Sequence, residues 1–175
     1  MKSLLAPLAL CALVSVAGAQ TVEQDATKLK LGDSIPDVAV VDHNSAAVNL
    51  AQEGKTGFTL FFFYPRALTR GCTAQACSLR DSYEELKDKG VKIFGVSNDT
   101  VEKQKEFVDV NSLPYQLLAD TENKVIGAFG VPLSNSNAAS RQAYLFKDGK
   151  LIWLDTKAST AKQAEDVLNA LAKPL

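Results

Sequence analysis

The chain has 175 residues, of which 46% are hydrophobic and 22% charged, values typical of a folded domain. Its 19 Lys and Arg against 20 Asp and Glu give a formal net charge of -1, so charge gives no reason to expect a nucleic acid or an anionic membrane as partner. With only 3 cysteines the chain is no disulfide-dense miniature scaffold, and its composition excludes disorder. The length supports one domain with a substantial core.

The first 19 residues have the order of a secretory signal peptide. Lys2 precedes an apolar run from Leu4 to Val16, and Ala17-Gly18-Ala19 supplies the small residues that a signal peptidase reads. This run of 13 residues contains Pro7 and is shorter than the ~20 residues needed to span a membrane. We therefore expect cleavage after residue 19, no membrane attachment afterwards, and export to the periplasm or the extracellular space.

Residues 20–30 are polar and predict a flexible lead-in to one domain over residues 31–175. Segments 38–41 and 48–50 are short and β-branched, and can pair across a turn at Asp42-His43-Asn44. The strongest strand signal is Phe58–Tyr64, which is apolar almost throughout, as expected for a strand buried on both faces.

Over residues 73–89 the apolar residues then recur with the spacing of an α-helix. One stripe of this helix carries Cys72, Ala76, Leu79, Tyr83 and Leu86, whereas Cys77 falls on roughly the opposite side. A strand is predicted over 91–96, followed by a helix over 100–110 that Asp99 can cap.

The remainder alternates in the same way. We predict a strand over 115–118, a short helix over 122–129 and a polar loop over 131–142. Strands 143–146 and 151–154 flank Asp148-Gly149, a strong hairpin signal, and a capping box at Thr160 opens a last helix to Ala172. Alternating strands and helices predict an α/β domain with a central mixed sheet flanked by helices.

Removal of the signal peptide takes Cys11 and leaves two cysteines, Cys72 and Cys77, in a compartment where thiols tend to oxidise. Five residues apart on an α-helix, their Cα atoms are separated by roughly 8.6 Å. A disulfide needs a Cα separation below about 7 Å, so the pair cannot be bonded while the helix is intact. That conflict favours a redox switch over a structural staple.

Cys72 lies where the buried strand passes into the predicted helix. Free backbone N–H groups and the positive end of the helix dipole stabilise a thiolate over a thiol at such a position. Arg70 adds a positive charge, and Thr69 offers a hydroxyl that can donate or accept a hydrogen bond. The placement favours a reactive cysteine over an inert buried thiol.

A specific pattern surrounds this cysteine: Phe62-Phe63-Tyr64-Pro65, Thr69, Gly71-Cys72-Thr73, Ala76-Cys77 and Arg80-Asp81. It resembles the active-site segment of peroxiredoxins, and most closely the Q-type, or bacterioferritin-comigratory-protein, group. The likeness extends from Leu31-Gly32-Asp33 to Asp148-Gly149 and covers most of the chain after residue 19. A Pro-x-x-x-Thr-x-x-Cys pattern with a second Cys five residues later is far more specific than a lone cysteine pair.

The resemblance implies a thioredoxin-like fold and a thiol-dependent peroxidase that reduces hydrogen peroxide and organic hydroperoxides. Cys72 matches the peroxidatic cysteine and Cys77 the resolving cysteine, which closes an intramolecular disulfide that a thioredoxin or thioredoxin-like reductant reopens. Thr69 and Arg141 match the residues that complete the peroxide pocket, and Pro65 the proline that shields it. The resemblance implies no cofactor and no metal, and it favours a monomer.

Two residues depart from the pattern of the group. Arg70 stands where proline is usual, and Gln75 stands where glutamate is usual. We expect Arg70 to favour the Cys72 thiolate further.

Two other functions compete with the peroxidase. A thiol–disulfide oxidoreductase would use Cys-x-x-Cys, whereas four residues intervene here. A metal-binding thioredoxin-like module would need further soft ligands, but the only His is His43, in a predicted turn where a solvated or capping role is expected, and the only Met is Met1. A cysteine protease is weaker still, because no His lies on a segment expected to reach Cys72.

Overall fold

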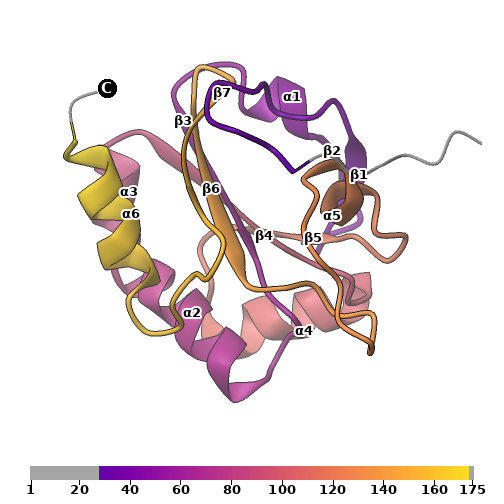
Figure 1. Ribbon diagram of the computed structural model, residues 1–175. Coiled ribbons are helices and arrows are strands. Elements are labelled where there is room, and N and C mark those ends of the chain that lie inside the picture. Colours follow the sequence, from indigo (N-terminus) through magenta and orange to yellow (C-terminus); the bar gives the residue numbers. More distant parts are fainter. Residues whose placement is uncertain (1–27, 174–175) are drawn as a thin grey trace, which may run out of the picture.

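A computed structural model describes residues 28–173 of the chain (Figure 1). The predicted signal peptide and residues 20–27 of the predicted lead-in lie outside these residues. The strands are β1 (Ala39–Asp42), β2 (Ala47–Asn49), β3 (Phe58–Phe63), β4 (Val91–Ser97), β5 (Gln116–Ala119), β6 (Gln142–Lys147) and β7 (Lys150–Asp155). The helices are α1 (Leu50–Glu53), α2 (Arg70–Asp81), α3 (Tyr83–Asp88), α4 (Val101–Asn111), α5 (Lys124–Ala128) and α6 (Gln163–Leu171).

All strands belong to one sheet in the order β2-β1-β5-β4-β3-β6-β7. β4 runs parallel to both β3 and β5, whereas the β1–β2, β1–β5, β3–β6 and β6–β7 pairs are antiparallel. The predicted mixed sheet is therefore confirmed. Among residues 28–173, no helix is long and apolar enough to cross a bilayer.

Helices cover both faces of this sheet (Figure 1). α2, α3, α4 and α6 pack on one face, where they share a core with Leu60, Phe62 and Tyr64. α1, α5 and the loop after α5 cover the other face, where Phe61 and Phe63 lie. Alternate side chains of β3 thus enter two different cores, which confirms the prediction of a strand buried on both faces.

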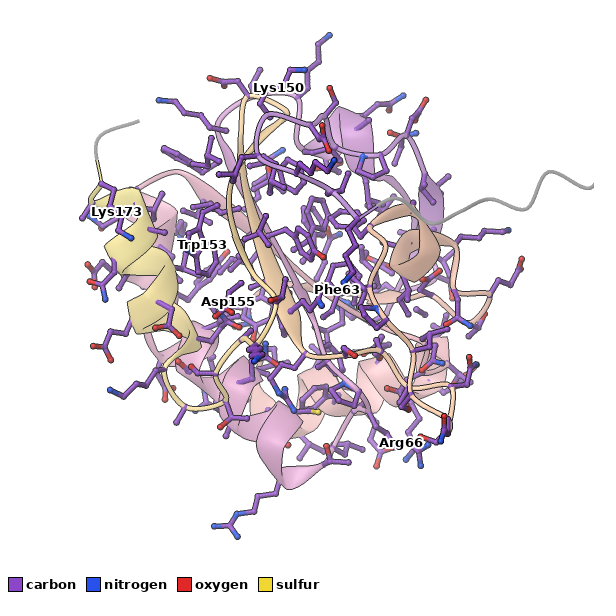
Figure 2. The ribbon with its side chains drawn as sticks, viewed as in Figure 1. Phe63, Arg66, Lys150, Trp153, Asp155 and Lys173 are labelled. Atoms are coloured by element: carbon purple, nitrogen blue, oxygen red, sulfur yellow. The ribbon has the colours of Figure 1, made fainter. Side chains whose placement is uncertain are left out.

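Full burial of β3 anchors the site that follows it. From residue 60 to residue 64 every side chain has 0% exposure. Each buried aromatic or leucine side chain contributes about 1.5–3 kcal/mol through the hydrophobic effect, so the end of this strand is held firmly. Figure 2 shows Phe63 in the interior and Arg66 at the outer edge, at the end of the molecule opposite the turn that precedes Lys150.

The single helix predicted over 73–89 is two helices. α2 begins three residues earlier than predicted, at Arg70, because Thr69 already has the extended backbone of an N-cap residue (φ -83°, ψ 149°). The helix breaks at Ser82, which has weak helix propensity and whose carbonyl accepts from Leu86 N–H as α3 begins. The predicted stripe is otherwise confirmed, with Cys72, Ala76, Leu79 and Leu86 fully buried.

One predicted strand end and two predicted helix caps were wrong in detail. The segment predicted as a strand over 48–50 ends at Asn49, whose side chain accepts from Gln52 N–H and starts α1. α4 is capped by Thr100, not by Asp99, and α6 begins at Gln163 without the capping box predicted at Thr160. At α1 and α4 the polar side chain of the N-cap residue accepts from a free N–H of the first turn, whereas before α6 the Ser159 hydroxyl accepts from Lys162 N–H.

The predicted hairpins are confirmed. β1 and β2 pair across the turn after Asp42, and β6 and β7 pair across Asp148-Gly149. Asp148 and Gly149 have φ values of 47° and 78°, the two positive angles that a tight hairpin turn requires.

Candidate active site

The segment between β3 and α2 carries two of the predicted site residues, Pro65 and Thr69, in one tight turn of the chain. Pro65 ends the buried strand and is half-buried, and Leu68 has the left-handed φ of 62°. Thr69 then caps α2, and its hydroxyl donates to the Arg66 carbonyl at 3.0 Å. The segment is thus folded tightly back on itself before α2, the helix that carries Cys72, begins.

Cys72 is the third residue of α2 and is only 1% exposed. Thr73 N–H donates to the Thr69 carbonyl at 2.8 Å, which closes the first turn of the helix. The N–H of Cys72 itself is therefore one of the free donors at this helix end. The predicted position of the sulfur at the positive end of the helix dipole is confirmed.

Arg141 is distant from Cys72 in the sequence but contacts its sulfur in the fold. It immediately precedes β6, whose Gln142 pairs with Phe63, so the register of two central strands brings Arg141 to the end of β3. Its Nη2 lies 3.4 Å from Cys72 Sγ. The structure therefore brings together the cysteine and the arginine that the sequence analysis singled out.

Gln75 holds the other side of this guanidinium. Arg141 Nη1 donates to Gln75 Oε1, and Gln75 Nε2 donates to Gln163 Oε1 at 2.7 Å. Both glutamines have 0% exposure. The sequence analysis noted Gln75 only as a departure and missed Gln163, because residue 163 meets the site only through tertiary packing.

The other predicted residues lie at the rim. Thr69 and Arg70 are exposed, and Pro65 is half-buried. Because Arg70 points its charge into water, the effect expected of it on the Cys72 thiolate is screened by solvent; that effect stays a prediction.

Cys77 occupies the same helix in a different setting. Its sulfur is half-buried and lies 3.8 Å from Asn111 Oδ1, at the end of α4. Arg80, one turn later, donates to the Asn111 carbonyl at 2.8 Å. Both cysteines are free, and α2 is continuous through them, so the predicted separation by an intact helix is confirmed.

The sequence analysis predicts a solvated or capping role for His43, but the structure buries its side chain. Its Nδ1 accepts from Leu117 N–H at 3.2 Å, and its Nε2 lies 3.1 Å from Asn44 Nδ2. Packing of the β1–β2 turn against β5 removes the ring from water, and Nδ1 accepts its hydrogen bond from the main chain of β5. Among residues 28–173, no three His, Cys, Asp or Glu side chains gather in a way that could hold a metal ion.

A cavity of about 270 Å³ lies elsewhere, between β1 and the start of α5. Its lining includes Val41, Asp120 and Lys124, and it contains neither cysteine. The predicted site residues therefore gather around Cys72 and not in this cavity.

Comparison with known proteins identifies this arrangement. Residues 31–154 match the model of the AhpC/TSA family. The chain is 36% identical to peroxiredoxin Bcp of Escherichia coli K12 over 151 residues, which cover 82% of this chain and 96% of that protein. It is 38% identical over 128 residues to the chloroplastic peroxiredoxin Q of Arabidopsis thaliana, covering 73% of this chain and 59% of that one.

The chain belongs to the AhpC/TSA family of peroxiredoxins, in the Bcp and Q group. Among solved structures it is similar to peroxidoxin BcpB from Mycobacterium tuberculosis, with a TM-score of 0.76 and 30% identity, over 82% of this chain and 96% of that one. The thioredoxin-like fold expected from the sequence is thereby confirmed.

As a member of this group, the peroxiredoxin is a thiol-dependent peroxidase. Its substrate is a peroxide, and its reductant is of the thioredoxin type. The family membership favours this activity over the thiol–disulfide oxidoreductase and the metal-binding module that the residues alone left open.

Proposed function

We propose that this peroxiredoxin reduces hydrogen peroxide and organic hydroperoxides at Cys72, with Cys77 as the resolving cysteine. The observation that carries the assignment is the 3.4 Å contact between the buried Cys72 Sγ and Arg141 Nη2, at the free N–H end of α2. A guanidinium and a helix N-terminus both favour the thiolate, which is the nucleophilic form. The hydrogen-bond partner of Cys77 Sγ is instead the neutral side-chain amide of Asn111.

In the first step the Cys72 thiolate attacks the terminal peroxide oxygen, so that an S–O bond forms and the O–O bond breaks. Cys72 becomes a sulfenic acid, and the second oxygen leaves with a proton as water or an alcohol. Arg141 and the Cys72 N–H stabilise the negative charge that develops on the leaving oxygen. The Thr69 hydroxyl, whose proton goes to Arg66, keeps lone pairs that accept a hydrogen bond from the peroxide, and Pro65 shields the sulfur from water.

In the second step the Cys77 thiol attacks the sulfenic sulfur, an S–S bond forms, and water leaves. The two Cα atoms are roughly 8.6 Å apart on an intact helix, which is too far for a disulfide. α2 must therefore unwind locally, and Cys77 must leave its contact with Asn111. A reductant dithiol then restores both thiols by exchange and is itself oxidised to a disulfide.

We propose that the protein acts as a monomer. Both cysteines lie on α2 of one chain, so the resolving step needs no second subunit. Sedimentation of the reduced and oxidised protein tests this, since a dimer in either state would contradict it.

We propose further that the protein is exported and processed after Ala19, which makes an exported thioredoxin-like protein its reductant. The support is the order of charge, apolar run and small residues in the first 19 positions. Cell fractionation followed by N-terminal sequencing tests the proposal: the extracytoplasmic protein should begin at Gln20. A chain beginning at Met1 and confined to the cytoplasm would contradict it.

The peroxidase assignment is tested by mass spectrometry of the reduced protein after one equivalent of hydrogen peroxide. Loss of two hydrogens within seconds, together with a Cys72–Cys77 linked peptide, supports it. The Cys72→Ser variant should consume no peroxide. If both thiols of the parent stay reduced while peroxide persists, the assignment fails.

A further inference from the structure

The site contains a buried row of hydrogen bonds that leads away from the cysteine. It runs from Cys72 through Arg141 and Gln75 to Gln163, the first residue of α6. Both glutamine side chains are fully buried, so these hydrogen bonds do not compete with water. α6 is thereby connected to the reacting sulfur by side chains alone.

The amide of Gln75 is what makes this row necessary. A carboxylate at this position would only accept hydrogen bonds, whereas an amide both accepts and donates. Gln75 uses its oxygen for Arg141, so its buried NH₂ group requires an acceptor elsewhere. Gln163 supplies that acceptor at 2.7 Å, and this contact holds the end of the Gln75 amide that faces away from Arg141.

Charge gives the arrangement a chemical consequence. Among residues 28–173, no carboxylate forms an ion pair with Arg141, whose hydrogen-bond partners are the Cys72 sulfur and the neutral Gln75 oxygen. The guanidinium of Arg141 therefore presents its full positive charge to the Cys72 sulfur. Gln75, which carries no charge, positions Arg141 through a hydrogen bond and not through ion pairing.

The start of α6 is fastened to α2 at other points as well. Ala164 N–H donates to Ser78 Oγ at 3.1 Å. A Cβ atom added at Gly71 would lie 3.4 Å from Arg141 Nη2 and 3.5 Å from Thr160 Cγ2, so the segment before α6 lies over the same helical turn as the arginine.

We propose that Gln163 is a positioning residue of the peroxidase site: it orients the Gln75 amide, which orients Arg141 against Cys72. The inference rests on the proposed roles of Cys72 and Arg141. It adds α6, which contributes no residue to the predicted site, to the machinery that the peroxide meets.

The test compares three substitutions in the full protein. Gln163→Met keeps the length of the side chain and removes the acceptor, and Gln75→Met removes the next member of the row. Ser78→Ala is the matched control, because it breaks the other α2–α6 hydrogen bond and leaves the row intact. Rapid quenching and mass spectrometry after a single addition of peroxide measure the oxidation of Cys72. The one tryptophan of the chain, Trp153, packs against the core shared with α6, and its fluorescence checks that this core is intact in each variant (Figure 2).

Gln163→Met should slow oxidation of Cys72 by peroxide about tenfold, as expected when a group that orients the reactants shifts. Ser78→Ala should stay within about twofold of the parent. Adding Gln163→Met to Gln75→Met should cause no further loss, because the two residues act in series. Alkylation of Cys72 by iodoacetamide should not accelerate, whereas it would if Gln163→Met merely loosened α6 and exposed the buried thiol.

A Gln163→Met variant that reacts as fast as the parent would overturn the inference. So would an equal loss in Ser78→Ala, or additive losses in the double variant. These outcomes leave the peroxidase assignment standing. A parent protein whose Cys72 is not oxidised by peroxide would overturn both.

Discussion

The carboxylate of Asp99 accepts a hydrogen bond from the main-chain N–H of Ala67 at 2.7 Å. The same oxygen accepts from the Ser97 hydroxyl at 2.7 Å. Ala67 lies between the buried strand β3 and the N-cap of α2, so this side chain fastens the segment that presents Thr69. The residue predicted to cap α4 instead positions the entrance to the active site.

Asp99→Ala should weaken both the fold and the reaction. It leaves the Ala67 N–H without its charged acceptor, which lowers the free energy of unfolding by about 1–3 kcal/mol. Displacement of the segment should slow the reaction with peroxide by about tenfold. Urea unfolding and stopped-flow kinetics measure the two effects. Asp99→Asn keeps an oxygen acceptor and should retain most of both; an Asp99→Ala variant as fast as the parent would refute this role.

Tyr115 restrains the part of α2 that has to unwind. Its buried hydroxyl donates to the Ala76 carbonyl at 2.7 Å, next to Cys77. Burial raises the pKa of Tyr115 well above its ordinary value, so the hydroxyl keeps its proton and remains a donor.

Tyr115→Phe should therefore cost about 1 kcal/mol of stability and accelerate the resolving step. Rapid quenching after peroxide, with separate counts of sulfenic acid and disulfide by mass spectrometry, measures that step. Tyr83→Phe is the control: its ring packs near Tyr115 at 6.3 Å, and its hydroxyl makes no hydrogen bond to residues 28–173. A resolving step unchanged in Tyr115→Phe would argue against the restraint.

Cys77→Ser should stop the reaction halfway. Without a resolving thiol, Cys72 should gain one oxygen atom and persist as a sulfenic acid, which excess peroxide converts to the sulfinic acid. Intact mass measurement of the quenched protein follows both products. Sustained turnover of this variant at the rate of the parent would show that a thiol other than Cys77 resolves Cys72.

Asp120 should make stability depend on pH in a defined direction. The side chain is 2% exposed, and burial raises the pKa of its carboxyl, although N–H groups at the start of α5 partly oppose this. The folded protein therefore binds this proton more tightly than the unfolded chain. The stabilisation is complete below the ordinary aspartate pKa of about 3.9 and is lost as pH rises through the raised pKa.

Asp120→Asn cannot ionise and keeps an oxygen for the Ile126 N–H, which donates to Asp120 at 2.8 Å. Relative to the parent, the variant should become more stable as pH increases from about 4 to about 7. Urea unfolding of both proteins across that range gives the difference directly. A difference that is constant or falls with pH would contradict the raised pKa.

The sequence by itself determined the features whose causes are local. An uninterrupted apolar run marked β3, and an Asp-Gly pair between apolar segments marked the hairpin turn, because burial on both faces and positive φ angles each restrict residue type. The placement of Cys72 at the start of a helix, with Cys77 five residues on, follows from periodicity alone. The helix boundaries were less well predicted, since several neighbouring polar side chains can serve as the cap.

Only the tertiary structure decided how the site is completed. Arg141 meets a sulfur 69 residues away, and Gln75 meets Gln163 across 88 residues. These contacts depend on the register between β3 and β6 and on the packing of α6 against α2, which no local pattern encodes. Tertiary packing elsewhere buries His43 against β5 and brings Asp99 to the Ala67 N–H, because a polar side chain takes the partner that folding brings within reach rather than the nearest one in sequence.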